Sequence, residues 1–381
     1  MKIKSILWSV LIVGFLIMVP TTSTTPIALV DSAVLAQSDY PLGRYLPGFV
    51  YDPVNDRIMM FGGSNDVDLY DDTWVLNTTS GTWTELSLSV SPIARHSCVM
   101  VYDSSAEVII LFGGHNGTAW DSDTWIFDCN QETWTEVTPA ISPHGRGSAA
   151  MVYDSLNDKV LLFSGYSESG PDVSDTWAYD YISNTWEEMS PDVSPHARYG
   201  AAYTYDTENE SMLLFGGNSN GYFSDTWSYD YSSDTWTEMN PVSHPPALKW
   251  SQMVYDSNAQ KSILFGGDNV LSRAQNETWI YDSSINDWVE RQPTIAPPAK
   301  EAFGFAYDPV AEKAVLFGGT LHTPDTFNDT WAYDYTSNTW EEIGVPSVPS
   351  TIGSDVWLIL TSVSAVGIVL VVILLLLKRY R

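Results

Sequence analysis

The sequence predicts an all-β protein built from six copies of one unit, and three observations carry this prediction. An apolar run that ends in Phe-Gly-Gly recurs at a spacing of 50–52 residues, with Phe-Ser-Gly in the third copy. About ten residues later, each copy has Asp-Thr-Trp or Glu-Thr-Trp. A second tryptophan then follows nine positions after the first. A fixed period of this length is typical of radial or linear repeat arrays.

The third copy indicates what one unit contains. In chain order it has an alternating run at 148–153, a turn at 154–158, an apolar run at 160–163, a loop, a run at 176–179, a turn at 180–184 and a run at 185–189. Runs rich in aromatic and β-branched residues, separated by Asp, Asn, Ser and Gly, predict four short strands, which we call A to D. The segment between the two ends of the chain shows no sustained helical period. The glycines fit a strand end with positive φ or a close approach of a neighbouring backbone.

The unit resembles the kelch repeat. Kelch blades carry a hydrophobic run, then Gly-Gly, then two aromatic residues with six residues between them. That spacing recurs here in Tyr179–Trp186, Tyr229–Trp236 and Tyr333–Trp340. The resemblance covers roughly residues 44–343 and implies a β-propeller with one four-stranded antiparallel blade per repeat. Six complete repeats imply six blades, without the blade shared between the two chain ends that is common in the family.

The two ends predict a membrane-anchored protein. Residues 1–36 are typical of a secretory signal, because two lysines precede a short apolar stretch; whether the signal is cleaved stays open. Residues 356–377 carry no charge and are long enough for a transmembrane helix. The basic tail at 378–381 is expected on the cytoplasmic side, which places the propeller (37–343) outside the cell. A short tether at 344–355 joins the propeller to the helix.

The charge of the chain bears on its partners. The 17 basic and 47 acidic residues fall to 12 and 46 when the signal and the tail are left out, because these ends hold five basic residues and one acidic residue. The resulting net charge of −34 argues against nucleic acid or an anionic membrane surface as the ligand. Much of it is turn chemistry repeated six times, so the excess need not mark a binding surface.

The two cysteines are predicted to be buried thiols. Cys98 is expected near the start of strand A in the second repeat and Cys129 at the far end of strand C. With strand B between them they are too distant for a disulfide. Glycosylation sequons stand at Asn77, Asn116, Asn209, Asn276 and Asn328. Their use, the oligomeric state and calcium binding by the acidic A–B turns stay open.

Strand order predicts where a ligand can bind. The loops that join strands B and C, and those that join consecutive blades, are expected at one end of the propeller, which we call the loop end. The A–B and C–D turns are expected at the opposite, turn end. Loops on a rigid scaffold are the usual place for recognition.

One position before strand A is basic in five repeats. We call these residues the cationic collar: Arg44, Arg95, Arg146, Arg198 and Lys300, with Leu248 in the fifth repeat. Two interpretations are open. The collar can face the channel mouth and bind a carboxylate or an acidic peptide through forked hydrogen bonds. Alternatively, each residue can serve its own repeat by pairing with an aspartate such as Asp72 or by capping loop carbonyls.

Four residues that depart from the repeat are further candidates for ligand binding. Trp120 falls in the B–C loop of the second repeat, and Trp250 replaces a mostly small residue in the fifth. Lys249 lies beside Trp250, and Tyr166 is an off-pattern loop residue. Aromatic side chains at one end of a propeller suit a sugar, an aromatic ligand or a peptide anchor. The alternative for Trp250 is that it only fills space in an altered blade.

Catalytic and metal-binding patterns are absent from the sequence, and no cofactor is predicted. The six histidines are scattered, and no nucleophile, zinc or phosphate-loop motif occurs. We therefore expect a non-catalytic adhesion or binding module for a protein or glycan. Two alternatives stay open: an enzyme on acidic sugars that resembles sialic acid mutarotases, with Glu301 or Glu168 as acid or base, and a scaffold for a membrane protein complex.

Overall fold

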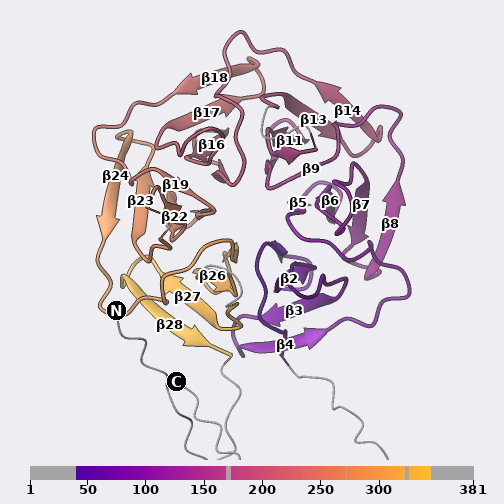
Figure 1. Ribbon diagram of the computed structural model, residues 1–381, viewed down its shortest axis with the longest axis horizontal. Coiled ribbons are helices and arrows are strands. Elements are labelled where there is room, and N and C mark those ends of the chain that lie inside the picture. The colour runs from indigo at the N-terminus through magenta and orange to yellow at the C-terminus, as the bar shows by residue number, and fades with distance from the viewer. Residues whose placement is uncertain (1–39, 169–172, 272, 322–325, 345–381) are drawn as a thin grey trace, which may run out of the picture. The chain divides into compact units, whose positions relative to one another are not determined.

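The computed structural model describes residues 40–168, 173–271, 273–321 and 326–344, which form six sheets arranged as blades around a central axis (Figure 1). This confirms the predicted six-bladed, all-β architecture. None of the described residues belongs to a helix, so this part of the chain holds no helix long and apolar enough to cross a membrane. The predicted signal, the predicted transmembrane helix, the predicted tail and the predicted tether beyond Gly344 lie outside the described residues.

The first three blades follow one another along the chain. Blade 1 consists of β1 (Gly48–Asp52), β2 (Arg57–Phe61), β3 (Thr73–Asn77) and β4 (Thr82–Glu85). Blade 2 consists of β5 (Val99–Asp103), β6 (Val108–Phe112), β7 (Thr124–Asp128) and β8 (Thr133–Val137). Blade 3 consists of β10 (Ala150–Asp154), β11 (Lys159–Phe163), β13 (Thr176–Asp180) and β14 (Thr185–Glu188), with β9 (Arg146–Gly147) and β12 (Tyr166–Ser167) as a separate short pair.

The last three blades repeat this order and complete the ring. Blade 4 consists of β15 (Ala202–Asp206), β16 (Ser211–Phe215), β17 (Thr226–Asp230) and β18 (Thr235–Glu238). Blade 5 consists of β20 (Gln252–Asp256), β21 (Lys261–Phe265), β23 (Thr278–Asp282) and β24 (Asp287–Arg291), with β19 (Leu248–Lys249) and β22 (Asp268–Asn269) as a short pair. Blade 6 consists of β25 (Gly304–Asp308), β26 (Lys313–Phe317), β27 (Thr330–Asp334) and β28 (Thr339–Ile343).

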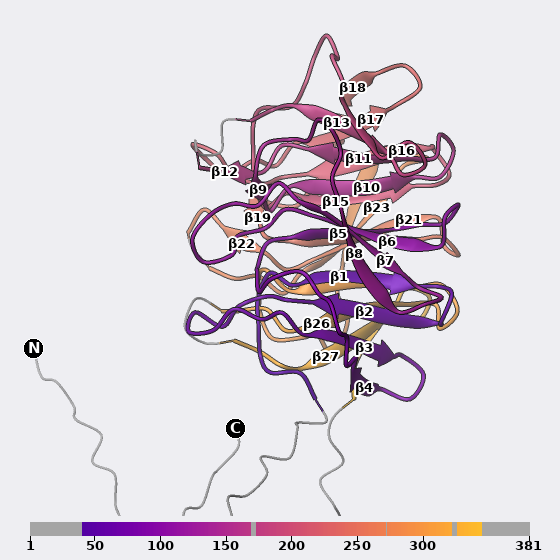
Figure 2. The same ribbon diagram turned by 90° about the vertical axis from the view of Figure 1, so that its right-hand side faces the viewer.

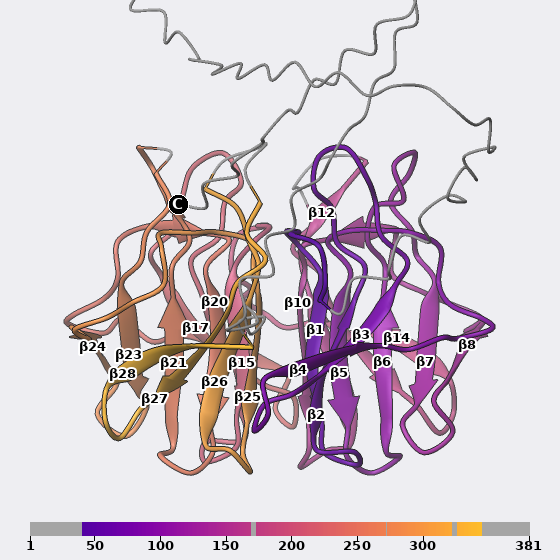
Figure 3. The same ribbon diagram turned by 90° about the horizontal axis from the view of Figure 1, so that it is seen from below.

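Each blade is an antiparallel meander whose first strand lies next to the axis and whose fourth lies at the rim (Figure 1). Short turns join A to B and C to D at one end, and longer loops lie at the other (Figure 3). The short pairs β9–β12 and β19–β22 lie at the end with the longer loops (Figure 2). They were not predicted, because two-residue strands leave no periodic pattern in the sequence. The predicted separation into a loop end and a turn end is confirmed.

The burial of each strand follows its place in the blade. Strand B has a neighbouring blade on both faces and is almost completely buried, as in Val108–Phe112 of blade 2. A strand buried on both faces reads as a continuous apolar run, which is the run before each Phe-Gly-Gly. Strand D is at the rim, where its tryptophan is buried and its other residues are mostly exposed, as in Thr185–Glu188.

The repeated motifs hold neighbouring blades together. The phenylalanine of each Phe-Gly-Gly or Phe-Ser-Gly lies against the second tryptophan of the following blade, as in Phe112–Trp186 at a centroid distance of 5.2 Å. The indole N–H of that tryptophan donates to the threonine of Asp-Thr-Trp or Glu-Thr-Trp in the preceding blade. The six bonds are Trp83–Thr330, Trp134–Thr73, Trp186–Thr124, Trp236–Thr176, Trp288–Thr226 and Trp340–Thr278. The first joins blade 1 to blade 6, so the ring closes without a shared blade.

The first glycine of each pair allows two blades to approach closely. Gly113 has a φ of +66°, and a Cβ atom there would lie 2.3 Å from the carbonyl oxygen of Arg146 in the next blade. Only glycine meets both conditions without strain. Ser164 takes this place in the third copy with a φ of +56°, and its hydroxyl donates to the carbonyl of Arg198 at 2.7 Å.

The two cysteines are both buried and unpaired, as predicted. Burial raises the pKa of the Cys98 thiol to about 11, although Arg95 acts to lower it. Cys98 is therefore protonated at neutral pH and unreactive, because the thiolate is the reactive species.

Candidate functional site

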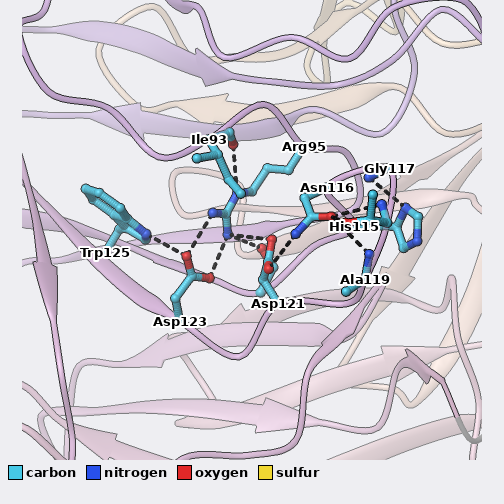
Figure 4. A network of polar contacts seen from close by, with 11 residues as sticks. Ile93, Arg95, His115, Asn116, Gly117, Ala119, Asp121, Asp123 and Trp125 are labelled. Atoms are coloured by element: carbon cyan, nitrogen blue, oxygen red, sulfur yellow. Dashed lines mark hydrogen bonds and ion pairs between the residues drawn. The ribbon is translucent and has the colours of Figure 1, made fainter.

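The cationic collar lies inside the blades. The side chain of Arg95 is 1% exposed, and its Nη1 and Nη2 donate to the two carboxylate oxygens of Asp123 at 2.6 and 2.8 Å (Figure 4). Its Nε donates to the carbonyl of Ile93 at 3.1 Å, and Nη1 also donates to the carbonyl of Gly113 at 2.9 Å. The guanidinium is thus held on several sides by its own blade and the preceding loop.

The same arrangement recurs around the ring. The other pairs are Arg44–Asp72, Arg146–Asp175, Arg198–Asp225 and Lys300–Asp329. All five cations are buried, so the expected cationic surface at the channel mouth is not formed, which corrects that interpretation. A buried guanidinium is stable only with a partner, and the nearby aspartate supplies one. The structure has the second arrangement that the sequence left open.

Blade 5 departs from this arrangement at both partners. Leu248 replaces the collar cation and is buried, and Glu277 replaces the aspartate. In the other five blades the aspartate also accepts the indole N–H of its own motif, as Asp123 does from Trp125 at 2.7 Å. The indole N–H of Trp279 in blade 5 has no such partner among the described residues. Blade 5 therefore lacks the collar ion pair that the other five blades have.

Two aspartates of the collar pairs, Asp175 and Asp225, are expected to make the propeller sensitive to acid. Burial acts to raise the pKa of Asp175, but the hydrogen bonds and charge of Arg146 outweigh it and hold that pKa below its usual range. The pKa of Asp225, which Arg198 holds, is lowered for the same reasons. Such a carboxyl contributes stability that is complete above its unfolded pKa of about 3.9 and is lost as pH falls through its folded pKa.

We therefore expect the free energy of unfolding to decrease as pH falls below about 4. Urea unfolding of the full-length chain at a series of pH values checks this. The variant Asp175→Asn is the control, since it removes one of the titrating groups and should show a shallower decrease. An equal slope in the variant and the natural protein would contradict the assignment.

A ring of backbone hydrogen bonds surrounds the axis at the loop end. The residue two positions after each collar residue donates its N–H to the carbonyl of the equivalent residue in the preceding blade, at 2.7–3.0 Å. The ring runs in order through Leu46, Ser97, Ser148, Gly200, Trp250 and Ala302 and returns to Leu46. All six have a φ between +50° and +61°. These six residues thus form a closed hydrogen-bonded ring around the mouth of the channel, and Trp250 is one of its members.

One residue lies between each collar residue and the residue of the hydrogen-bonded ring. It pairs with the residue after the second glycine of the same blade. The pairs are Tyr45–Ser64, His96–His115, Gly147–Tyr166, Tyr199–Asn218, Lys249–Asp268 and Glu301–Thr320. These positions differ from blade to blade, whereas the neighbouring collar is nearly constant. The sequence offers one indication that these side chains point outward. Neighbouring residues of an extended chain face opposite sides, so a residue next to an inward-pointing side chain points outward.

Aromatic side chains at these positions join the predicted tryptophans. Ring centroids lie 5.5 Å apart between Trp120 and Tyr166, 5.3 Å between Tyr166 and Tyr199, and 6.1 Å between Tyr199 and Trp250. We call these four residues the aromatic band. Tyr166 is 37% exposed, and the other three are partly exposed. The structure therefore brings three of the predicted residues together across blades 2 to 5, with Tyr199 as the member that was missed.

Both tryptophans of the aromatic band rest on glycines of a neighbouring blade. A Cβ atom on Gly147 would lie 2.5 Å from Cζ3 of Trp120, and one on Gly200 would lie 2.5 Å from Cδ1 of Trp250. Gly147 takes a position that is Tyr, His, Lys or Glu in the other blades, and Gly200 a position that carries side chains in the other five. Each off-pattern tryptophan thus has a matching off-pattern glycine in the neighbouring blade.

Lys249 lies at one end of the aromatic band. Its ammonium is 4.1 Å from the ring centroid of Trp250 and 5.2 Å from that of Tyr222. It also lies 3.5 Å from the buried carboxylate of Asp268, which accepts the hydroxyl of Tyr222 at 2.7 Å. Burial acts to lower the pKa of Lys249, but these neighbours outweigh it and raise that pKa. The surroundings of Lys249 therefore stabilise an ammonium ion.

The other end of the aromatic band is supported by a polar network (Figure 4). Asn116 donates to Asp121 at 2.9 Å and accepts the backbone N–H of Ala119 at 2.9 Å, which fixes the loop around Trp120. Asp121 lies 3.7 Å from Arg95 and thus connects this loop to the collar. Burial raises the pKa of Asp121, and Arg95 only partly offsets this effect.

Two histidines extend the aromatic surface from Trp120 toward blade 1. The ring of His115 lies 4.8 Å from Trp120 and 5.4 Å from His96, which in turn lies 6.3 Å from Tyr45. Burial and then the neighbouring His115 lower the pKa of His96 to about 4. His96 is therefore neutral at physiological pH and contributes an uncharged ring.

Comparison with known proteins supplies the family. The model of the KLHDC2/KLHL20/DRC7 Kelch-repeats domain matches residues 29–194 and 155–355. The chain belongs to the kelch-repeat family. The resemblance noted from the Gly-Gly and aromatic spacing is thereby confirmed, and the six blades are kelch blades.

Three relatives of this kelch protein illustrate the range of similarity. Mei4-dependent protein 6 of Schizosaccharomyces pombe is 27% identical over 45% of this chain and 27% of its own length. An F-box/kelch-repeat protein of Arabidopsis thaliana is 28% identical over 49% of this chain and 41% of its own length. Kelch domain-containing protein 2 of Bos taurus is 25% identical over 43% of this chain and 40% of its own length. The chain thus spans less than half of the length of these curated relatives.

The kelch propeller also encloses a cavity of about 520 Å³ along its axis, lined by the innermost strands of all six blades. Six tyrosines that precede the last residue of strand A line it toward the turn end: Tyr51, Tyr102, Tyr153, Tyr205, Tyr255 and Tyr307. The aspartate after each tyrosine is buried, and in blade 1 Asp52 accepts the backbone N–H of Val54 at 3.1 Å. The acidic turns are therefore explained by Asx-turn hydrogen bonds.

The described residues contain no group of three or more His, Cys, Asp and Glu side chains that could hold a metal ion. The two glutamates considered for catalysis belong to different blades: Glu168 is exposed next to β12 in blade 3, and Glu301 is buried next to the collar in blade 6. The aromatic band and Lys249, which the structure brings together at the loop end, include neither glutamate.

Proposed function

We propose that this kelch propeller is a non-catalytic binding module that holds a protein or glycan ligand on the aromatic band. The carrying observation is the continuous contact of Trp120, Tyr166, Tyr199 and Trp250 across four blades. Partly exposed aromatic side chains on a rigid base supply large contact area at a low cost in conformational entropy. Kelch propellers generally bind other proteins, which favours this class over an enzyme.

The internal pairing of the collar supports the non-catalytic assignment. An enzyme on acidic sugars would need a cation to hold the substrate carboxylate. The collar cations are buried and already occupied by aspartates, as Arg146 is by Asp175. Removing one from its partner to reach a substrate would leave an unpaired buried charge, which costs several kcal/mol (about 3–5).

We further propose that the propeller acts outside the cell, anchored by residues 356–377, with residues 378–381 in the cytoplasm. The sequence of the two ends supports this location. Biotinylation of intact cells with an impermeant reagent is expected to label the full-length chain. Labelling only after the cells are permeabilised would contradict it.

Ligand binding is expected to depend on the aromatic band. We would apply the full-length chain to arrays of glycans and peptides and then measure each hit again with the double variant Trp120→Ala, Tyr166→Ala. A loss of at least tenfold in affinity is expected, because central aromatic residues dominate binding energy. Ile182→Ala, which truncates an exposed residue of a C–D turn, is the control and should bind normally. Equal binding by all three proteins would overturn the proposed function.

A further inference from the structure

The charge of the residues around the aromatic band indicates which charge a ligand should carry. Each collar cation is neutralised by an aspartate, and Lys249 lies beside Asp268. Among the described residues of the B–C loops, Arg273 is the one further lysine or arginine. The same loops hold six more acidic residues: Asp66, Asp68, Asp71, Asp121, Glu168 and Glu277. The loop end is thus acidic, although its sequence suggested a basic collar.

The protein's own Lys249 indicates what such a surface holds. Its ammonium lies over Trp250 and Tyr222 and beside the buried Asp268. An aromatic face attracts a cation through its quadrupole, and a nearby carboxylate adds to the attraction. This end of the aromatic band is therefore a cation site that the chain itself occupies.

The rest of the aromatic band has the same chemistry without an internal cation. No lysine or arginine of the described residues lies over Trp120, Tyr166 or Tyr199. Asp121 directly follows Trp120, and its buried Oδ2 accepts no hydrogen bond from the described residues, although Arg95 lies 3.7 Å away. Glu168 is exposed two positions after Tyr166. Aromatic faces and carboxylates thus occur together a second time.

We propose that Trp120, Tyr166 and Tyr199 bind a lysine- or arginine-bearing segment of a partner protein, an inference that rests on the proposed function. The cationic side chain of this segment lies over these rings in the same way as the ammonium of Lys249 lies over Trp250. The acidic loops attract such a segment from a distance, and the rings then select it by cation–π contact. An acidic ligand is disfavoured, because the collar that would have bound it is buried and neutralised.

The test uses glycine–serine peptides of equal length that carry several lysines, several glutamates or no charge. Calorimetric titration of the full-length chain is expected to show binding of the lysine peptide alone, weaker at high salt. Tyr166→Leu and Trp120→Leu, which remove an aromatic face without changing charge, should each weaken binding about fivefold. Glu187→Gln on the rim strand β14 is the charge control and should bind normally.

The variant Lys249→Met distinguishes a positively charged ligand from a negatively charged one. It vacates the internal cation site, so the lysine peptide should bind at least twofold more tightly; an acidic ligand that used Lys249 would bind more weakly. Binding of the glutamate or neutral peptide through Tyr166 would overturn the cationic ligand and leave the proposed function standing. The inference is equally overturned if no peptide binds, or if the leucine variants bind the lysine peptide as well as the natural protein. The proposed function itself fails only if no array ligand depends on the aromatic band.

Discussion

Arg95→Ala is expected to lower the free energy of unfolding by about 3–5 kcal/mol, the cost of breaking a buried ion pair from one side. The substitution leaves the carboxylate of Asp123 with one of its two partners, the indole of Trp125. It also leaves the carbonyls of Ile93 and Gly113 without their donor. Urea unfolding of the full-length chain, followed by tryptophan fluorescence, measures the change.

Blade 5 provides the matched control for this experiment. Arg95→Leu combined with Asp123→Asn removes both charges of the pair. Leucine is the residue that blade 5 has at the collar position, Leu248, and the asparagine keeps an oxygen that can accept the indole N–H of Trp125. Replacing both members of a buried pair costs less than removing one, since no unpaired buried charge is left in an apolar site. The double variant should therefore regain more than half of the stability lost by the single variant. A single variant that loses less than about 1 kcal/mol, the value of a surface pair, would contradict the assignment.

The collar shows how far the sequence determines a functional surface. The repeat and its kelch spacing place Arg95 before strand A, and both possible roles fit that position. The choice depends on which way one side chain points, because neighbouring residues of an extended chain face opposite sides. In the structure Arg95 points into the blade, and His96, one residue later, lies among the partly exposed rings. A single-residue register separates a ligand-binding cation from a structural one, and no spacing in the sequence reports it.

The aromatic band shows the complementary case. Trp120 and Trp250 were predictable because each departs from a repeat whose other positions were already explained. Tyr199 was not, since its position varies among the repeats, with Tyr, His, Gly, Lys or Glu, and no departure is visible. Its contacts with Tyr166 and Trp250 arise between blades, from segments that lie far apart in the chain. Departures from a repeat thus locate a surface, but contacts across blade boundaries need the structure.

Trp186→Ala is expected to lower the free energy of unfolding by about 3–5 kcal/mol, the usual loss for removing a buried tryptophan. Its side chain is 4% exposed and packs 5.2 Å from the ring of Phe112 in blade 2 and 5.0 Å from Tyr179 in its own blade. The indole N–H also donates to the hydroxyl of Thr124 at 3.2 Å. The change therefore removes a contact between blades as well as a part of the core.

Trp186→Phe separates these contributions, because it keeps an aromatic ring in the site and loses the hydrogen bond, for which about 1–2 kcal/mol is expected. The equivalent hydrogen bond between Trp83 and Thr330 joins blade 1 to blade 6 and closes the ring, so each blade is held on both sides. A closed ring has no terminal repeat from which unfolding can begin, in contrast to an open array. Both variants should therefore unfold in a single transition, and a separate early transition of blades 2 and 3 would contradict this account of the closure.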